Sequence, residues 1–224
     1  MYKRQPIDLA ITDARSNLLD SLRFASHDRA HGISIVFGGK VIAGTRAKKE
    51  FSKSYNAFSS INYPDIAVIH DDRIVFYIDD KDQATTPLRF YHAMNNKIFL
   101  LKLIPSIDAG VLEGLMQYYD GLIIESFGVG GLPDYGDHEF MAMLEKWTKA
   151  GKLVVMSTQV TNDGSDMCVY EVGKEIKTHF PILESYDMTL EATVTKMMWV
   201  LAQTLDFEEC KKLFYTTINR DILF

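Results

Sequence analysis

Two adjacent lysines, Lys48 and Lys49, are the residues whose type and setting best suit a chemical role. They follow a β-prone apolar run, and the next residues, 51–63, are rich in aromatic and asparagine side chains. A lysine held in partly apolar surroundings loses solvation of its charged form, so its pKa falls from about 10.4 toward the range of a usable base. From composition alone, a solvent-exposed pair is the simpler interpretation. Both interpretations therefore stay open at this point.

A glycine-containing loop, 127–133, is a second candidate site. It follows an apolar run and precedes a helical pattern, and α/β sheets bind ligands at their carboxyl edge. A dinucleotide fingerprint also requires glycine three positions after Gly130, where this chain has Pro133. Gly128 and Gly130 thus give only weak support for nucleotide binding. The alternative is a loop whose backbone packs closely against a neighbouring segment.

Other reactive patterns point to no metal centre and no cofactor. Among the six histidines, only His27 and His31 come near a ligand spacing, and Gly32 and the polar surroundings indicate a helix end there. No Gly-x-Ser-x-Gly sequence occurs, which argues against a serine nucleophile elbow. We expect Cys168 and Cys210 to be free thiols in a reducing, cytoplasmic environment.

The composition limits the classes of partner. The chain has 224 residues, 47% of them hydrophobic, which excludes intrinsic disorder, and a formal charge of −6. An acidic chain without a lysine- and arginine-rich run argues against a nucleic-acid partner. The longest apolar run, 98–101, is far too short to span a bilayer, and the N-terminal residues lack a signal-peptide core. We therefore expect neither a nucleic acid nor a membrane as partner.

The first structured element is predicted to be a helix. Thr12 and Asp13 are residue types that cap helix N-termini. After them, Leu18, Leu22 and Ala25 recur at the spacing that places side chains on one helix face.

Two β-hairpins are predicted after this helix. Gly38-Gly39 separates two β-prone runs, and paired glycines favour a tight turn because both central positions can take positive φ. A second hairpin is predicted from the runs 66–69 and 74–78. Between the two hairpins, the polar stretch 45–62 has few signals of regular structure.

Strand and helix patterns alternate from residue 97 onward. Short apolar runs typical of parallel strands covered on both faces lie at 98–103, 121–125 and 153–156. Helical patterns lie at 108–118, 140–149 and 189–205. This alternation indicates right-handed βαβ crossovers and a parallel sheet.

These patterns predict an α/β protein in two parts. Residues 1–78 form an N-terminal α/β region with β-hairpins, and residues 97–224 form a small open parallel-sheet α/β domain. The connecting segment, 79–96, is predicted to be a linker, because its first part is charged and short of apolar residues.

Several motifs along the chain carry a family resemblance. They are Thr12-Asp13-Ala14-Arg15-Ser16-Asn17-Leu18, Gly44-Thr45-Arg46-Ala47-Lys48-Lys49, and the segments 56–64, 125–133, 157–159, 169–173 and 187–192. In this order they resemble the L-asparaginase family, particularly its cytoplasmic (type I) branch. The resemblance extends from about residue 6 to about residue 206. It implies that residues 1–78 are the remainder of that family's N-terminal catalytic domain.

The resemblance also implies a site and a reaction. Family members use a threonine nucleophile in a Thr-Gly-Gly-Thr loop, and a Gly-Thr-Asp motif whose aspartate bridges to a lysine; Lys49 matches that catalytic lysine. Neither threonine motif occurs here, so we expect an N-terminally truncated fragment with foreign residues 1–5, inactive alone. The implied reaction of the intact enzyme is hydrolysis of L-asparagine, or of L-glutamine, through a threonyl ester.

The resemblance implies a homo-oligomer, and Gly130 agrees with the cytoplasmic branch, since periplasmic members usually carry asparagine in that loop. An alternative is a non-catalytic module that oligomerises or binds an amino acid. A further variant, an asparaginase-like component of a tRNA-dependent amidotransferase, would add a nucleic-acid partner, which the acidic charge argues against. We also expect poor solubility, because strands missing from the first domain would leave unpaired edges.

Overall fold

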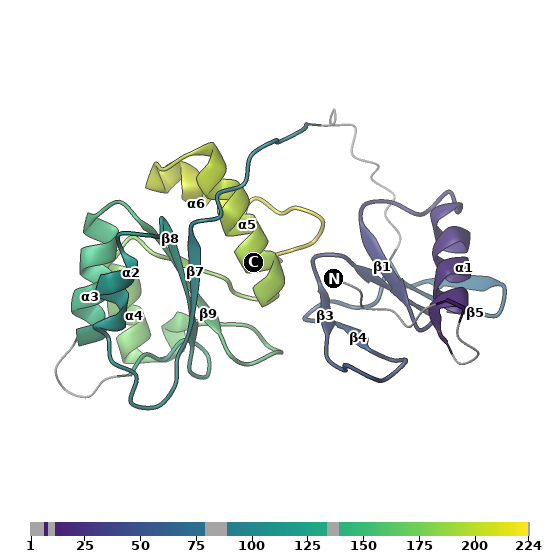
Figure 1. The fold of residues 1–224 in the computed structure, drawn as a ribbon, viewed down its shortest axis with the longest axis horizontal. Coiled ribbons are helices and arrows are strands. Elements are labelled where there is room, and N and C mark those ends of the chain that lie inside the picture. Colours follow the sequence, from purple (N-terminus) through teal and green to yellow (C-terminus); the bar gives the residue numbers. More distant parts are fainter. Residues whose placement is uncertain (1–6, 9–11, 79–88, 134–138, 224) are drawn as a thin grey trace. The chain divides into compact units, whose positions relative to one another are not determined.

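The protein divides into two compact units, Met1–Arg89 and Phe90–Phe224 (Figure 1). The computed structural model describes residues 7–8, 12–78, 89–133 and 139–223. Residues 79–88 of the predicted linker lie outside the described residues, and residues 89–96 form neither helix nor strand.

The first unit contains a helix and a four-stranded antiparallel sheet of order β1-β2-β5-β6. The helix is α1 (Ala14–Ala25), and the strands are β1 (Ser34–Phe37), β2 (Lys40–Ala43), β5 (Ala67–His70) and β6 (Arg73–Phe76). Both predicted hairpins are confirmed, since β1 pairs with β2 and β5 pairs with β6. At the first turn, Gly38 and Gly39 have φ values of 59° and 73°, which other residues rarely adopt.

The predicted helix is present as α1, and the face that carries Leu18, Leu22 and Ala25 is exposed. Leu18 and Leu22 are 44% and 60% exposed, and Ala25 is also exposed. Instead, Phe24 reaches the core on the sheet, and Asn17 is buried because its Oδ1 accepts a hydrogen bond from the Gly38 N–H at 2.9 Å. These two anchors fix the rotation of the helix, and the leucines therefore lie on its open side.

A second, two-stranded sheet lies within the stretch 45–62, for which the sequence gives few signals of regular structure. It consists of β3 (Ala47–Lys49) and β4 (Phe58–Ser60), which pair antiparallel with Lys49 opposite Phe58. Each strand has three residues, and those of β3 include two lysines, so neither shows the alternation that predicts strands. The stretch 45–62, which has few signals of regular structure, therefore forms strands at these six positions.

The second unit is built on a parallel sheet of order β10-β9-β8-β7. Its strands are β7 (Ile98–Lys102), β8 (Gly121–Ser126), β9 (Leu153–Thr158) and β10 (Leu183–Glu184). The three predicted strands and the parallel pairing are confirmed. The edge strand β10 was not predicted, because two residues are too few for a periodic signal.

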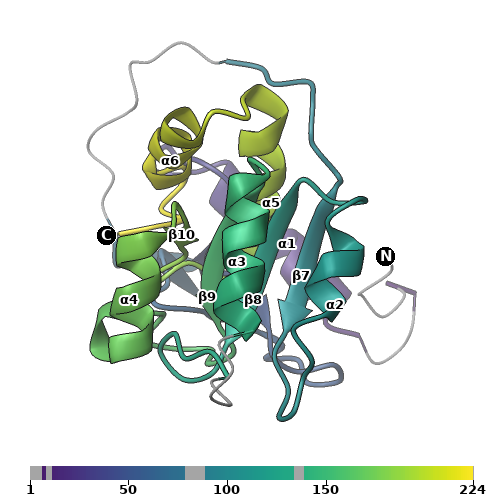
Figure 2. The same ribbon diagram turned by 90° about the vertical axis from the view of Figure 1, so that its left-hand side faces the viewer.

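Helices cover both faces of this sheet (Figures 1 and 2). They are α2 (Val111–Leu115), α3 (Glu139–Lys149), the short 3-10 helix η1 (Met167–Val169), α4 (Glu171–His179), α5 (Leu190–Gln203) and α6 (Phe207–Tyr215). Alternate residues of β8 separate the two cores: Leu122 and Ile124 pack with α2, α3 and α4, whereas Ile123 packs with α5 and α6. Helices α4 and α6 were not predicted.

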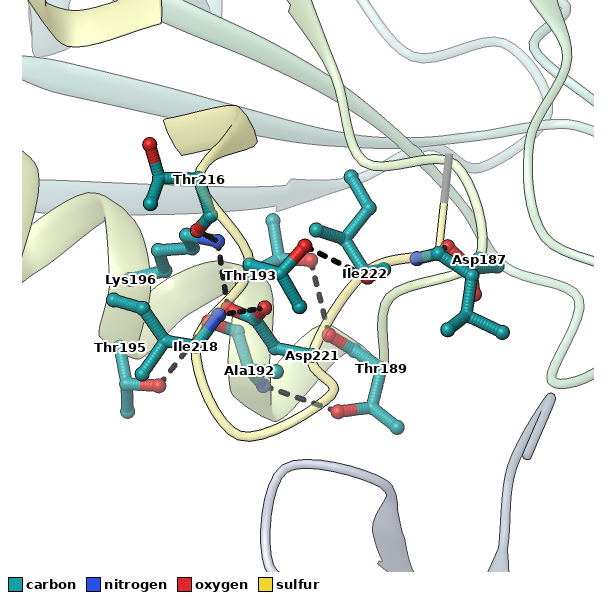
Figure 3. A network of polar contacts seen from close by, with 12 residues as sticks. Asp187, Thr189, Ala192, Thr193, Thr195, Lys196, Thr216, Ile218, Asp221 and Ile222 are labelled. Atoms are coloured by element: carbon teal, nitrogen blue, oxygen red, sulfur yellow. Dashed lines mark hydrogen bonds and ion pairs between the residues drawn. The ribbon is translucent and has the colours of Figure 1, made fainter. Parts of the chain in front are cut away.

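A buried ion pair ties the C-terminal residues to α5 (Figure 3). The Lys196 Nζ lies 2.7 Å from Asp221 Oδ2 and donates a hydrogen bond to the Thr216 carbonyl at 2.8 Å. Both charged side chains are under 5% exposed (3% and 4%). Burial lowers the pKa of Lys196, although the hydrogen bond and charge of Asp221 oppose that shift. This contact accompanies complete burial of Ile222 in the core.

Candidate active site

Lys49 lies at the end of β3 and lines a hollow of about 280 Å³ in the first unit. The other lining residues are Asp13, Phe37, Ser52, Lys53, Ser54, Tyr55 and Ala57. The Lys49 side chain is half-buried, and no described residue forms a hydrogen bond or ion pair with its amine. An amine in this position is available to a bound molecule or to a reacting group.

The strand geometry separates the two lysines. Successive side chains of a strand point to opposite faces, so Lys48 and Lys49 project to opposite sides of the β3–β4 sheet. Lys49 pairs with Phe58, whose ring contacts that of Phe37 at a centroid distance of 5.2 Å. Phe37 of this aromatic pair lines the hollow, which also has charged and hydroxyl groups. The predicted apolar surroundings are thus only partly present.

Asp13 also lines the hollow, although its position before α1 predicted a different role, as a helix cap. We predicted that Asp13 would cap α1, but its side chain forms no hydrogen bond to the helix it precedes. The Thr12 hydroxyl accepts from the Ala14 N–H at 3.1 Å instead. The separation of Asp13 and Lys49 in the sequence did not indicate that they share a site. Only the fold places the two residues in the same hollow. With Lys53, the hollow has one carboxylate and two amines, a set able to bind a zwitterionic molecule.

Backbone contacts hold the segment that surrounds Lys49. The N–H groups of Glu50 and Phe51 donate to the Ala57 carbonyl at 2.9 and 3.3 Å, which closes the 50–57 loop. A side chain at Gly38 would lie 3.1 Å from the Tyr55 carbonyl, so the first hairpin turn sits close against this loop. The hairpin predicted from the sequence therefore helps to shape the hollow.

The loop 127–133 in the second unit has the close packing that we gave as the alternative to nucleotide binding. Phe127 and Gly131 exchange backbone hydrogen bonds of 3.0 and 2.8 Å, which closes a tight turn after β8. At Gly130, with φ 145°, a Cβ would lie 3.2 Å from the Met167 Cα. The interpretation as a packing loop is confirmed.

A polar network joins α4, β10, η1 and α6 in the second unit. Lys177 Nζ lies 2.6 Å from the buried Glu184 carboxylate and 3.1 Å from the Tyr186 hydroxyl. Burial disfavours the charged form of Lys177 and by itself lowers its pKa. The hydrogen bonds with Glu184 and Tyr186 outweigh this effect and raise the pKa above the ordinary value. The Tyr215 hydroxyl accepts from the Glu184 N–H at 2.9 Å, and burial raises the pKa of Tyr215 to about 12. Because these charged and hydroxyl groups all have partners, the network stabilises the fold.

Other features of the described residues bear on function. No group of three or more histidine, cysteine, aspartate or glutamate side chains is placed there to hold a metal ion. Cys168 is an exposed free thiol and Cys210 a buried one. Within the same described ranges, no helix is both long and apolar enough to cross a membrane.

The two units define a two-domain α/β class, with antiparallel hairpins in one unit and a helix-covered parallel sheet in the other. Comparison with known families then identifies the family within this class. Residues 4–82 match the family model described as "Asparaginase, N-terminal", and residues 97–214 match "Glutaminase/Asparaginase C-terminal domain". The chain belongs to the asparaginase family.

Relatives and solved structures agree with this assignment. An L-asparaginase of Thermococcus kodakarensis is 36% identical over 217 residues, which cover 97% of this chain and 65% of the relative. A component of the glutamyl-tRNA(Gln) amidotransferase of Methanobrevibacter smithii is 30% identical over 94% of this chain and 49% of its own length. The structure of the thermostable T. kodakarensis L-asparaginase matches with a TM-score of 0.89 at 34% identity, covering 96% of this chain and 64% of that one. The chain thus spans between about half and two thirds of these proteins.

Proposed function

We propose that this chain supplies the active-site lysine and the parallel-sheet domain of an asparaginase-type amidohydrolase. Family membership supports the reaction class. The observation that carries the residue assignment is the Lys49 amine, which lines the 280 Å³ hollow without a hydrogen-bonding or ionic partner among the described residues. A lysine so placed can receive and return a proton during amide hydrolysis.

The proposed reaction has two steps. A threonine Oγ attacks the side-chain amide carbonyl of L-asparagine, backbone N–H groups hold the oxyanion, and ammonia leaves. Water then attacks the threonyl ester and releases aspartate. Lys49 takes up the proton displaced from the threonine and returns it later in the cycle. The family's two threonine motifs do not occur in this chain, so we propose that residues outside this sequence supply the nucleophile and that the chain alone is inactive.

The substrate proposed is L-asparagine, with L-glutamine as the second candidate. Asp13 and Lys53, which share the hollow with Lys49, offer charges of both signs to the α-amino and α-carboxylate groups of an amino acid. We further propose a cytoplasmic homo-oligomer that acts without a cofactor, a nucleic acid or a membrane.

A chimera tests this function. The part of T. kodakarensis L-asparaginase that this chain does not match is joined to the chain, and ammonia release from L-asparagine is measured. Hydrolysis by the folded chimera, with none by the chain alone, supports the proposal. A folded chimera that releases no ammonia from L-asparagine or L-glutamine contradicts it.

The alternative is a non-catalytic module that binds an amino acid. The missing threonine motifs and the mixed charges of the Lys49 hollow favour it. Titration calorimetry of the unmodified chain with L-aspartate and L-asparagine separates the two functions. The module is supported by saturable binding of the amino acids combined with an inactive chimera, whereas hydrolysis by the chimera supports the enzyme.

A further inference from the structure

We propose that the segment 216–223 is a clamp whose closed state sets the order of the loops at the carboxyl edge of the parallel sheet. The clamp lies within the second unit and does not involve the Lys49 hollow, so the inference goes beyond the proposed amide hydrolysis. Ligands of α/β proteins bind in the crevice at the carboxyl edge of the sheet. Control of these loops is therefore control of the edge that is best suited to binding.

One carboxylate fastens the clamp to α5 (Figure 3). The segment 216–223 contains neither helix nor strand, so side-chain contacts hold it in place. The Asp221 Oδ2 lies 2.7 Å from the Lys196 Nζ, and the Asp221 Oδ1 accepts a hydrogen bond from the Ile218 N–H at 2.8 Å. The same carboxylate thus closes the turn 218–221 and attaches it to the helix.

The turn that Asp221 closes has an unfavourable backbone conformation. Asn219 and Arg220 are consecutive non-glycine residues with φ values of 48° and 65°. Such conformations persist only where the surrounding structure holds them. The Asp221 contacts provide this constraint, because they join the two ends of the turn, where the Asp221 N–H also donates to the Ile218 carbonyl. Loss of the contacts lets the turn relax, which gives the clamp a second, open state.

The clamp holds the connection between β10 and α5. The Leu223 N–H donates to the Asp187 Oδ1 at 3.1 Å. The Tyr215 hydroxyl, directly before the clamp, accepts from the Glu184 N–H at 2.9 Å. The two contacts grip this connection at both ends, so its position depends on whether the clamp is closed.

The same connection holds the loop that follows β9. The Glu184 Oε1 accepts from the Met167 N–H at 2.8 Å, and the Tyr186 carbonyl accepts from the Ser165 N–H at 2.9 Å. Between these two amides, the Asp166 N–H donates to the Val129 carbonyl, in the loop after β8, at 2.7 Å. A continuous series of contacts therefore leads from the clamp to two carboxyl-edge loops. Energetic coupling along such a series is what the experiment has to measure.

Hydrogen exchange of the full chain tests the clamp. The double variant Lys196→Met with Asp221→Leu removes the fastening and leaves no buried charge unpaired. We expect the amides of Leu223 and of residues 165–167 to exchange at least about tenfold faster in this variant than in the unmodified chain. Faster exchange at Leu223 with unchanged exchange at 165–167 overturns the proposal. Unchanged exchange at all four amides also overturns it, because the Asp221 contacts would then not hold the clamp closed.

Leu201→Ala is the matched control. Leu201 belongs to the same core as Ile222 but packs beside Gly121, at the start of β8 and thus at the opposite edge of the sheet. The variant lowers the free energy of unfolding and leaves the Asp221 contacts intact, so we expect no faster exchange at 165–167 under native conditions. Equal acceleration by Leu201→Ala and by the double variant would show that these amides report global unfolding, and would overturn the clamp. The readout needs neither substrate nor nucleophile, so its failure is separate from failure of the hydrolase.

Discussion

The Lys196 Nζ lies 2.7 Å from Asp221 Oδ2 in an ion pair whose side chains are 3% and 4% exposed. Removing one partner leaves an uncompensated buried charge, which costs about 3–5 kcal/mol. We predict that Lys196→Met lowers the free energy of unfolding by roughly this amount. Urea unfolding followed by tryptophan fluorescence measures it, because Trp147 and Trp199 both lie in the second unit.

The double variant Lys196→Met with Asp221→Leu is the control for this prediction. It removes both charges, and apolar replacement of a buried pair is often close to neutral. We expect the double variant to be more stable than Lys196→Met alone. A double variant whose loss equals the sum of the two single losses would show that the charges are not coupled.

Two groups of α6 predict how stability changes in alkaline solution. Burial raises the pKa of Tyr215 to about 12, and burial, with the nearby Asp206 and Glu209 charges, raises that of Cys210 to about 11. Both folded pKa values exceed the unfolded ones, about 10 and 9, so the folded state retains protons that the unfolded state has lost. Stability is therefore predicted to fall as the pH rises from about 9 to about 12. Urea midpoints at several pH values check this.

Tyr215→Phe isolates the tyrosine part of this pH dependence. The variant should show a shallower loss of stability over the upper part of the alkaline range. Titration by tyrosinate absorbance should lose its component near pH 12 in the same variant. Loss of tyrosinate absorbance at a lower pH, with the component near pH 12 retained, would contradict this assignment of the Tyr215 pKa.

A side chain at Gly173 in α4 is predicted to destabilise the protein. A Cβ there would clash with the Met167 carbonyl oxygen, so the backbone must move. We expect Gly173→Ala to destabilise the protein by about 1–3 kcal/mol. Gly114 in α2 is the matched control, because a Cβ there meets nothing within 4 Å. Gly114→Ala is expected to be neutral or to stabilise by up to about 1 kcal/mol, and equal thermal shifts for the two would contradict the packing argument.

Much of the fold was predictable from local chemistry. Gly38-Gly39 placed the first hairpin because its turn needs positive φ at both positions, and the apolar runs of β7, β8 and β9 predicted a buried parallel sheet. Strands of two or three residues, such as β10 and β3, carry too little periodicity to predict. Helix α6 did have a signal that we overlooked, since Asp206 caps it by accepting from the Glu209 N–H at 2.9 Å.

The candidate site was predictable only in part. Lys49 came from the family resemblance, and its position on a short strand could not be read from its neighbours. Asp13 looked like a helix cap because residue type alone does not show that Thr12 provides the cap. The spacing of Leu18 and Leu22 could not show that their face is exposed, because Phe24 and Asn17, which fix the rotation of the helix, make contacts distant in sequence.

The role of Lys49 is tested most directly by comparing Lys49→Met and Lys48→Met in the full-length chimera with T. kodakarensis L-asparaginase. The two lysines are adjacent in β3 but project to opposite sides, so each variant removes one amine of the same type from the same strand. We predict that Lys49→Met lowers kcat for L-asparagine by roughly 10²–10⁴-fold, and that Lys48→Met changes it far less. Near-normal turnover by a folded Lys49→Met chimera would contradict the account.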